Sequence, residues 1–75
     1  MNNEIMTCAG RVWHHLNENG ECTFKGLENA LMAEETPMRR VILAMAVGWL
    51  SREDKLSFRE EGYGRRYRLL IRLRQ

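Results

Sequence analysis

The sequence has few of the residues that cross-link or anchor a small protein. Its 75 residues include two cysteines, Cys8 and Cys22, which are too few for a disulfide framework. Both lie in apolar sequence, and we expect small buried thiols in a reducing compartment. The first ten residues lack a basic segment followed by an apolar one, so they do not form a secretory signal. No apolar run approaches the roughly 20 residues of a membrane span. We therefore expect a cytoplasmic protein.

The sequence also lacks the motifs that support catalysis or hold a metal ion or cofactor. It contains no Gly-rich phosphate loop, activated-nucleophile motif or paired-carboxylate pattern. The residues that could bind zinc are Cys8, His14, His15 and Cys22, and they do not show the C-x₂-C or H-x₃-H spacing of a structural site. Adjacent helical histidines point about 100° apart and cannot form a catalytic dyad. We expect neither an enzyme nor a cofactor or metal site.

The chain is long enough for one domain, residues 1–75, with no room for a second core. Domains of this size bury only about 60% of their unfolded surface, so oligomerisation often helps to stabilise them. The charge is unevenly distributed. Residues 1–51 have four basic and six acidic side chains (−2), whereas residues 52–75 have eight basic and four acidic ones (+4). A basic C-terminal third favours an anionic partner, and the alternative is a solvated, charged strand face.

Apolar spacing predicts two helices in the first half of the chain. From about residue 4 to 17, four apolar side chains recur at helical intervals: Ile5, Ala9, Val12 and Leu16. A second helix is expected from about 24 to 32, with Thr23 as its N-cap. Its short connection to the next helix is typical of a helix-turn-helix pair.

A third helix is expected from about 37 to 52, with Thr36 as N-cap and Pro37 at the first helical position. One stripe of this helix consists of Met38, Ile42, Met45 and Trp49, bordered by Val41 and Gly48. Other apolar residues fall outside that stripe, so the helix is apolar almost all round. A chain this short can hardly cover such a helix alone. We therefore predict a homodimer whose interface includes Leu43, Val47, Leu50 and Leu70.

After the third helix the apolar period changes from 3.6 to 2 residues, which predicts two strands at about 55–60 and 65–74 with a glycine-containing hairpin between them. The second strand is expected to be longer than the first and to need another neighbour. That neighbour is either a short strand at 21–23 or a second protomer. The order predicts an α+β, winged helix-turn-helix fold with three helices and a small antiparallel sheet.

Two runs carry a resemblance to a known family. They are Val12-Trp13-His14-His15-Leu16-Asn17-Glu18-Asn19-Gly20 in the first helix and Gly48-Trp49-Leu50-Ser51-Arg52-Glu53-Asp54-Lys55 at the end of the third. With them the chain resembles, over roughly residues 10–73, a small family of stand-alone bacterial winged-helix proteins whose cellular role is largely uncharacterised. The resemblance implies the winged-helix fold and transfers no activity.

The first candidate site is Arg39 and Arg40 in the first turn of the third helix. The resemblance of the chain to DNA-binding winged helices implies that this end of the helix enters a major groove, where arginine can read guanine. The alternative is a local ion cluster with Glu34 and Glu35. The apolar residues that follow offer few side chains to read bases.

The second candidate site is the hairpin, with Arg59, Tyr63, Arg65, Arg66 and Arg68. Arginines around an exposed aromatic at a hairpin tip can straddle a phosphate backbone or enter a minor groove. The alternative is that these charges protect an outer strand against sheet-to-sheet aggregation.

Two functions follow from these features. The first is a homodimeric protein that binds duplex DNA in a regulatory role. The second is a protein-interaction and dimerisation module that uses the apolar surface of the third helix and binds no nucleic acid.

Overall fold

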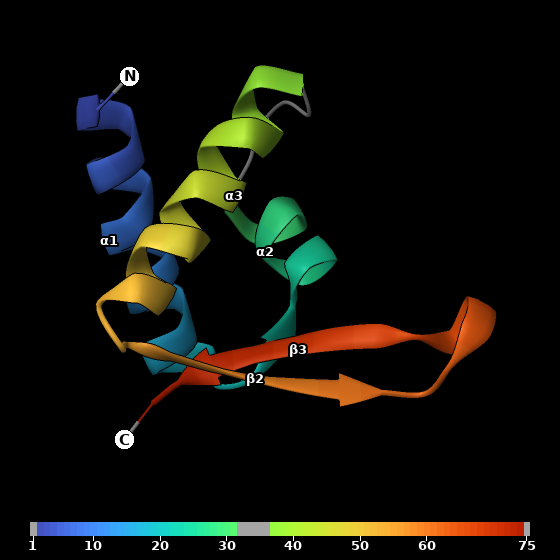
Figure 1. Cartoon of the computed structure of the whole chain (residues 1–75). Coiled ribbons are helices and arrows are strands. Elements are labelled where there is room, and N and C mark those ends of the chain that lie inside the picture. Colours follow the sequence, from blue (N-terminus) through green and yellow to red (C-terminus); the bar gives the residue numbers. More distant parts are fainter. Residues whose placement is uncertain (1, 32–36, 75) are drawn as a thin grey trace.

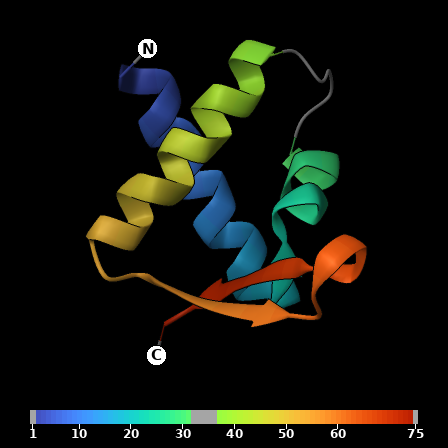
Figure 2. The same cartoon turned by 45° about the vertical axis from the view of Figure 1, so that its right-hand side comes forward.

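The computed structural model describes residues 2–31 and 37–74. In these residues, three helices pack on one side of a three-stranded antiparallel sheet, and a β-hairpin extends from the sheet beyond the helices (Figures 1 and 2). The elements in chain order are α1 (Asn2–Asn19), β1 (Cys22–Thr23), α2 (Phe24–Leu31), α3 (Pro37–Arg52), β2 (Leu56–Glu61), the 3₁₀ turn η1 (Gly64–Arg66) and β3 (Arg68–Leu73). The predicted α+β winged-helix architecture is confirmed.

The helix boundaries follow local signals. Thr23 Oγ1 accepts a hydrogen bond from the backbone N–H of Gly26 at 3.0 Å, so the predicted N-cap of α2 is present. α1 is longer than predicted at both ends, since it runs from Asn2 to Asn19. Thr36, the predicted cap of α3, and the connection at 32–36 lie outside the described residues, as do Glu34 and Glu35.

After α3, a hydrogen-bonded turn at residues 51–55 leads the chain into the sheet. The backbone N–H groups of Asp54 and Lys55 donate to the carbonyls of Ser51 and Leu50, both at 3.0 Å. Asp54 has a left-handed conformation, with φ of 60°, and its side chain pairs with Arg74 at the end of the last strand. β2 therefore starts at Leu56 beside the C-terminal residues of the chain.

The strand order is β1-β3-β2, so β3 lies between the other two strands. Cys22 is opposite Ile71, and Leu56 is opposite Leu73. The predicted neighbour at 21–23 is thus confirmed within the chain. The prediction of a longer last strand was wrong, because β2 and β3 each have six residues. Residues that were assigned to the strand instead form η1, where the backbone N–H of Tyr67 donates to the Gly64 carbonyl.

The core lies where α1 and α3 cross above the sheet. Its fully or nearly fully buried members come from every layer: Ala9, Val12, Leu16, Leu27, Leu43, Ala46, Val47, Leu50, Leu56 and Ile71. The inward stripe predicted for α1 is confirmed by the burial of Ala9, Val12 and Leu16. Burial of these side chains supplies the main stabilisation of the fold.

On α3, the apolar face that we expected at a dimer interface is buried in the structure, and the opposite apolar face is exposed. Leu43, Val47 and Leu50, which we expected at a dimer interface, are 0–8% exposed and belong to the core of a single chain. Leu70, also expected there, is 6% exposed. Packing against the rest of the fold covers that face of α3, and Leu70 is buried on the central strand β3, so these four residues are not available to a partner.

The opposite face of α3 is exposed. Met38, Val41, Met45 and Trp49 are 54%, 48%, 46% and 38% exposed, and we refer to these four residues as the outer stripe. The apolar surface anticipated on this helix therefore exists, but on the other side.

Candidate nucleic-acid interface

The arginines on the wing strands are bound to carboxylates. Arg59 on β2 makes two hydrogen bonds to Glu21, from Nη2 at 2.7 Å and from Nε at 3.2 Å. Its Nη1 also donates to Glu61 at 2.9 Å, and Arg68 on β3 pairs with the other oxygen of Glu61. We refer to Glu21, Arg59, Glu61 and Arg68 as the wing-base cluster. It contains two positive and two negative charges, so it presents no net charge to a phosphate backbone.

The ionisation of these groups follows from the same contacts. The hydrogen bond from Arg59 lowers the pKa of Glu21 below its ordinary value of 4.5. The hydrogen bonds from Arg68 and Arg59 likewise lower the pKa of Glu61. The two carboxylates in turn raise the pKa of Arg59. These contacts therefore favour the charged states of Glu21, Arg59 and Glu61 at neutral pH.

The tip of the wing is different. Tyr63 is 88% exposed, and Arg65 and Arg66 lie in η1 as the exposed residues next to it. Within residues 2–31 and 37–74 neither arginine makes an ion pair. We refer to Tyr63, Arg65 and Arg66 as the wing tip. Figure 2 shows η1 at the tip of the β-hairpin, opposite the end of the hairpin where β2 starts and β3 ends.

Backbone geometry fixes the shape of the tip. Gly62, which precedes Tyr63, has φ of 74°, and a Cβ atom there would lie 2.3 Å from the Arg66 carbonyl oxygen. The backbone N–H of Arg66 donates to the Tyr63 carbonyl at 3.1 Å. Only glycine fits this approach, because it has no Cβ and tolerates positive φ. The wing tip is therefore held in a defined turn.

Arg40, in the first turn of α3, forms an ion pair with a residue of α2. Its Nε lies 3.3 Å from Glu28 Oε2, and Lys25 Nζ lies 3.8 Å from the same oxygen. The Glu28 side chain is only 10% exposed, and its Oε2 accepts no hydrogen bond, so the contact is an ion pair. A buried carboxylate without a cation is costly. Arg40 thus links the start of α3 to α2.

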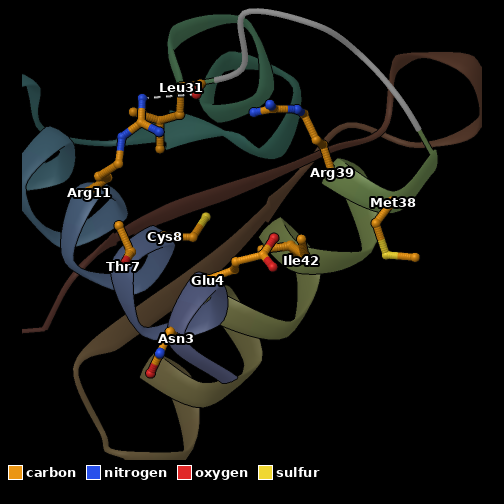
Figure 3. A pocket seen from close by; sticks show the side chains of 9 residues that line it. All are labelled: Asn3, Glu4, Thr7, Cys8, Arg11, Leu31, Met38, Arg39 and Ile42. Atoms are coloured by element: carbon orange, nitrogen blue, oxygen red, sulfur yellow. Dashed lines mark hydrogen bonds between the residues drawn. The ribbon is translucent and has the colours of Figure 1, made fainter. Parts of the chain in front are cut away.

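Arg39 lies at a cleft between α1 and the start of α3, shown in Figure 3. The cleft has a volume of about 460 Å³ and is lined by Asn3, Glu4, Thr7, Cys8, Arg11, Leu31, Met38, Arg39 and Ile42. Arg11 Nη2 donates to the Leu31 carbonyl at 3.0 Å across one edge. Burial raises the pKa of the Cys8 thiol, so this thiol is protonated at neutral pH and is a weak nucleophile.

The residues proposed for DNA binding thus occupy four places rather than one surface. Arg39 lines the cleft, Arg40 contacts α2, and the hairpin residues divide between the wing-base cluster and the wing tip. Sequence reasoning missed Glu21 and Glu28, whose carboxylates bind the guanidinium groups of Arg59 and Arg40, respectively. Glu21 is 38 residues from Arg59, and no local pattern joins them.

The described residues also bear on metal binding and membrane insertion. In residues 2–31 and 37–74, no group of three or more His, Cys, Asp or Glu side chains is placed to hold a metal ion. His14 instead faces Glu18 at 3.0 Å, and His15 contacts Asn19. None of the helices in this part of the chain has the length and apolar character needed to cross a membrane.

Comparison with known proteins agrees with the fold. The sequence model of a winged helix-turn-helix domain family, DUF2582, matches residues 1–69. Neither the curated proteins nor the solved structures gave a match. The match covers all three helices, the wing tip and the start of β3. The chain therefore belongs to the winged helix-turn-helix domain family DUF2582.

Proposed function

We propose that this protein is a cytoplasmic, non-enzymatic homodimer that binds duplex DNA in a regulatory role. The winged helix-turn-helix fold is typically a DNA-binding module. The observation that carries the proposal is the wing tip, where two exposed arginines that make no ion pair within residues 2–31 and 37–74 follow an exposed tyrosine in a hydrogen-bonded turn.

The wing tip has the chemistry of a phosphate or minor-groove contact. Arg65 and Arg66 can donate hydrogen bonds to phosphate oxygens, and an arginine can enter a narrow minor groove, where the negative potential is strongest. Tyr63 adds an aromatic ring and a hydroxyl to the same end of the hairpin. Such contacts position a protein on DNA and carry little sequence information by themselves.

Other arginines would bind DNA only at a cost. Arg40 would have to leave the buried Glu28 carboxylate, and Arg59 would have to leave two carboxylates. Arg68 shares Glu61 with Arg59. We therefore omit these three residues, as well as Arg39 in the cleft, from the proposed contact surface.

The test is fluorescence anisotropy of a labelled random-sequence duplex, titrated at low and at physiological salt. We expect binding in the micromolar range that weakens steeply with salt. The variant Arg65→Ala/Arg66→Ala should reduce the salt slope by about two, one for each phosphate contact. Lys55→Ala is the matched control, because it removes an exposed cation at the opposite end of β2.

The outcomes separate clearly. No binding at about 100 μM protein in low salt, the weak end of non-specific affinity, would contradict DNA binding altogether. Binding with an unchanged salt slope in the tip variant would exclude the wing tip from the contact surface.

A second candidate function is a protein-interaction module that binds no nucleic acid. The specific observation in its favour is the outer stripe of α3, since exposed apolar patches on small proteins commonly mark protein interfaces. Absence of DNA binding together with association through this stripe would favour the second function over the first.

A further inference from the structure

We infer that the cleft between α1 and the first turns of α3 binds a small aromatic carboxylate, with the anionic group of the ligand at Arg11. Figure 3 shows this cleft, whose described lining comes from α1, the end of α2 and the start of α3. The site is separate from the wing tip, so the inference goes beyond DNA binding and does not depend on it.

The cleft has the size of a small-molecule site. Its volume of about 460 Å³ lies within the range of roughly 300–1,000 Å³ that is typical of ligand pockets. At about 30 Å³ for each water molecule in the liquid, the same space corresponds to roughly 15 waters, or to an organic molecule of roughly 15 non-hydrogen atoms. This size favours a compound of one or two rings over an inorganic ion or a peptide.

Part of the lining is apolar. Ile42 on α3 is 9% exposed, and Leu31 at the end of α2 is partly buried, so both present hydrocarbon to the cleft. Met38 also lines the cleft and is 54% exposed. Methionine adapts to the shape of a ligand, and its thioether makes favourable contacts with aromatic rings. This lining therefore favours an aromatic ring over a sugar or another polyhydroxylated ligand.

Arg11 is the polar group that would hold the ligand. Its Nη2 donates to the Leu31 carbonyl at 3.0 Å, which fixes the guanidinium at one edge of the cleft. Within residues 2–31 and 37–74 this is its one hydrogen bond, and no carboxylate pairs with it. A guanidinium has several N–H donors in a planar fork that matches a carboxylate. Arg11 thus keeps donors for an anion while its position is already fixed.

The charges around the cleft give the ligand a direction. Arg39 adds a second guanidinium to the lining, and Glu4 adds a carboxylate. Glu4 lies seven residues before Arg11 on α1, which is about 10 Å along the helix axis. In Figure 3 both guanidinium groups lie towards Leu31, whereas Glu4 lies towards Ile42. An anionic group is therefore attracted to the Arg11 end of the cleft and repelled from the Glu4 end.

The Cys8 thiol in the lining indicates reversible binding. Burial raises the pKa of this thiol, and the nearby positive charge of Arg11 opposes that effect. The charge of Arg11 therefore acts on groups that line the cleft. Because the thiol is protonated at neutral pH, it is a weak nucleophile, and we expect no covalent bond to the ligand.

The test is a ¹H–¹⁵N NMR titration of the full chain with 2-naphthoate at neutral pH. This probe has two fused rings, one carboxylate and about 13 non-hydrogen atoms, so it fits the volume of the cleft. We expect a dissociation constant of roughly 0.2–1 mM, as for other ligands of this size. The shifted amides should be those of residues 3–11 and 38–42.

A neutral ligand of the same shape tests the role of charge. The amide 2-naphthamide should bind the wild-type chain about tenfold more weakly than 2-naphthoate, because it cannot form a charge-assisted hydrogen bond as an acceptor. Arg11→Gln should weaken the binding of 2-naphthoate about tenfold and change that of 2-naphthamide by less than about twofold. If Arg11 only held the end of α2, its loss would change both affinities equally.

Two further variants test where the ligand binds. Arg52→Gln is the matched control, because Arg52 is an exposed arginine at the other end of α3 that makes no ion pair in the described chain. This variant should bind 2-naphthoate as the wild type does. Thr7 is an exposed residue of the lining, so Thr7→Phe should fill the cleft without disturbing the core and weaken both ligands.

Three results with the wild-type chain would overturn the inference: no shifts with 2-naphthoate at about 2 mM, equal affinities for 2-naphthoate and 2-naphthamide, or shifts confined to residues away from the cleft. An unchanged affinity for 2-naphthoate in Arg11→Gln or in Thr7→Phe would also overturn it. The wild-type results remain decisive if a variant fails to fold. The titration contains no DNA, so its outcome is independent of the anisotropy test.

Discussion

The base and the tip of the wing contain the same kind of residue in opposite electrostatic settings. At the base, Arg59 and Arg68 share hydrogen bonds and ion pairs with Glu21 and Glu61. At the tip, Arg65 and Arg66 have no carboxylate partner within the described residues. This difference shows that an arginine-rich sequence does not by itself identify a DNA-binding surface. What matters is which guanidinium groups the fold leaves without a carboxylate.

The same distinction applies to α3. Arg40 reaches back to the buried Glu28 of α2 and joins the two helices, as the wing-base cluster joins Glu21 to the hairpin. Arg40, Arg59 and Arg68 thus connect elements of the fold, and the wing tip is one region of the described chain whose arginines have no carboxylate partner. The following predictions test this comparison, from the largest expected effect to the smallest.

Gly62→Ala should disturb the tip without changing any charge. The added Cβ would lie 2.3 Å from the Arg66 carbonyl oxygen at a φ of 74°, so the turn must open, at a cost of about 2 kcal/mol in the free energy of unfolding. Urea denaturation measures this loss. Gly64→Ala is the control, because its φ is also positive but its Cβ would meet no atom within 4 Å.

If the shape of the tip matters, Gly62→Ala should also weaken DNA binding more than Gly64→Ala does. Equal stability of the two variants would show that the approach to Arg66 is not a constraint on the turn.

Lowering the pH should weaken the ion pairs of the wing-base cluster and leave the wing tip unchanged. The pKa values of Glu21 and Glu61 are lowered in the folded protein, so the stabilisation from their ionised forms is present above the ordinary value of 4.5. It is lost as the pH falls below that value through the folded pKa values. Titration of these carboxyl groups by NMR should therefore give midpoints below 4.5, and midpoints at or above it would contradict the cluster.

Glu21→Gln should remove one of the two carboxylate partners of Arg59 and leave it paired with Glu61 alone. Because Glu21 is exposed to solvent and surface ion pairs contribute little, we expect only a small fall in melting temperature, less than that of Gly62→Ala. Arg59, which then shares only Glu61, should increase DNA affinity and raise the salt slope by up to about one. Glu18→Gln on α1 is the control, since it removes an equal charge away from the wing.

An unchanged salt slope in Glu21→Gln would show that Arg59 cannot reach DNA even without its main partner. The distinction between base and tip would then depend on position rather than on ion pairing.

Sequence patterns predicted the elements and their order well, because these depend on local features. The apolar stripe of α1 has a single continuous face with polar residues opposite, so Ala9, Val12 and Leu16 could be assigned to the core from spacing alone. The Thr23 cap and the glycines of the hairpin are likewise local signals. The extent of the last strand was mispredicted, because the alternation of Arg66 with Tyr67 extends the strand pattern towards the hairpin, whereas hydrogen bonding places Arg65 and Arg66 in a turn.

The candidate site was only partly predictable. The sequence correctly drew attention to a basic hairpin, but it could not divide that hairpin into a neutral base and a cationic tip. This division depends on Glu21, which comes before β1 in sequence and reaches Arg59 only because β1 and β2 flank the central strand β3. Glu28 likewise meets Arg40 only because α2 packs beside α3.

By itself, the sequence determined the three helices, the hairpin and the winged-helix order, since each of these follows from periodicity, caps and turns within a few residues. The tertiary structure alone decided which side of α3 faces inward. Both sides of this helix are apolar with the same period, so no spacing rule could choose between Leu43-Val47-Leu50 and Met38-Met45-Trp49. Packing against α1, α2 and the sheet made that choice, because these elements cover one side of a helix and leave the other for solvent or a partner.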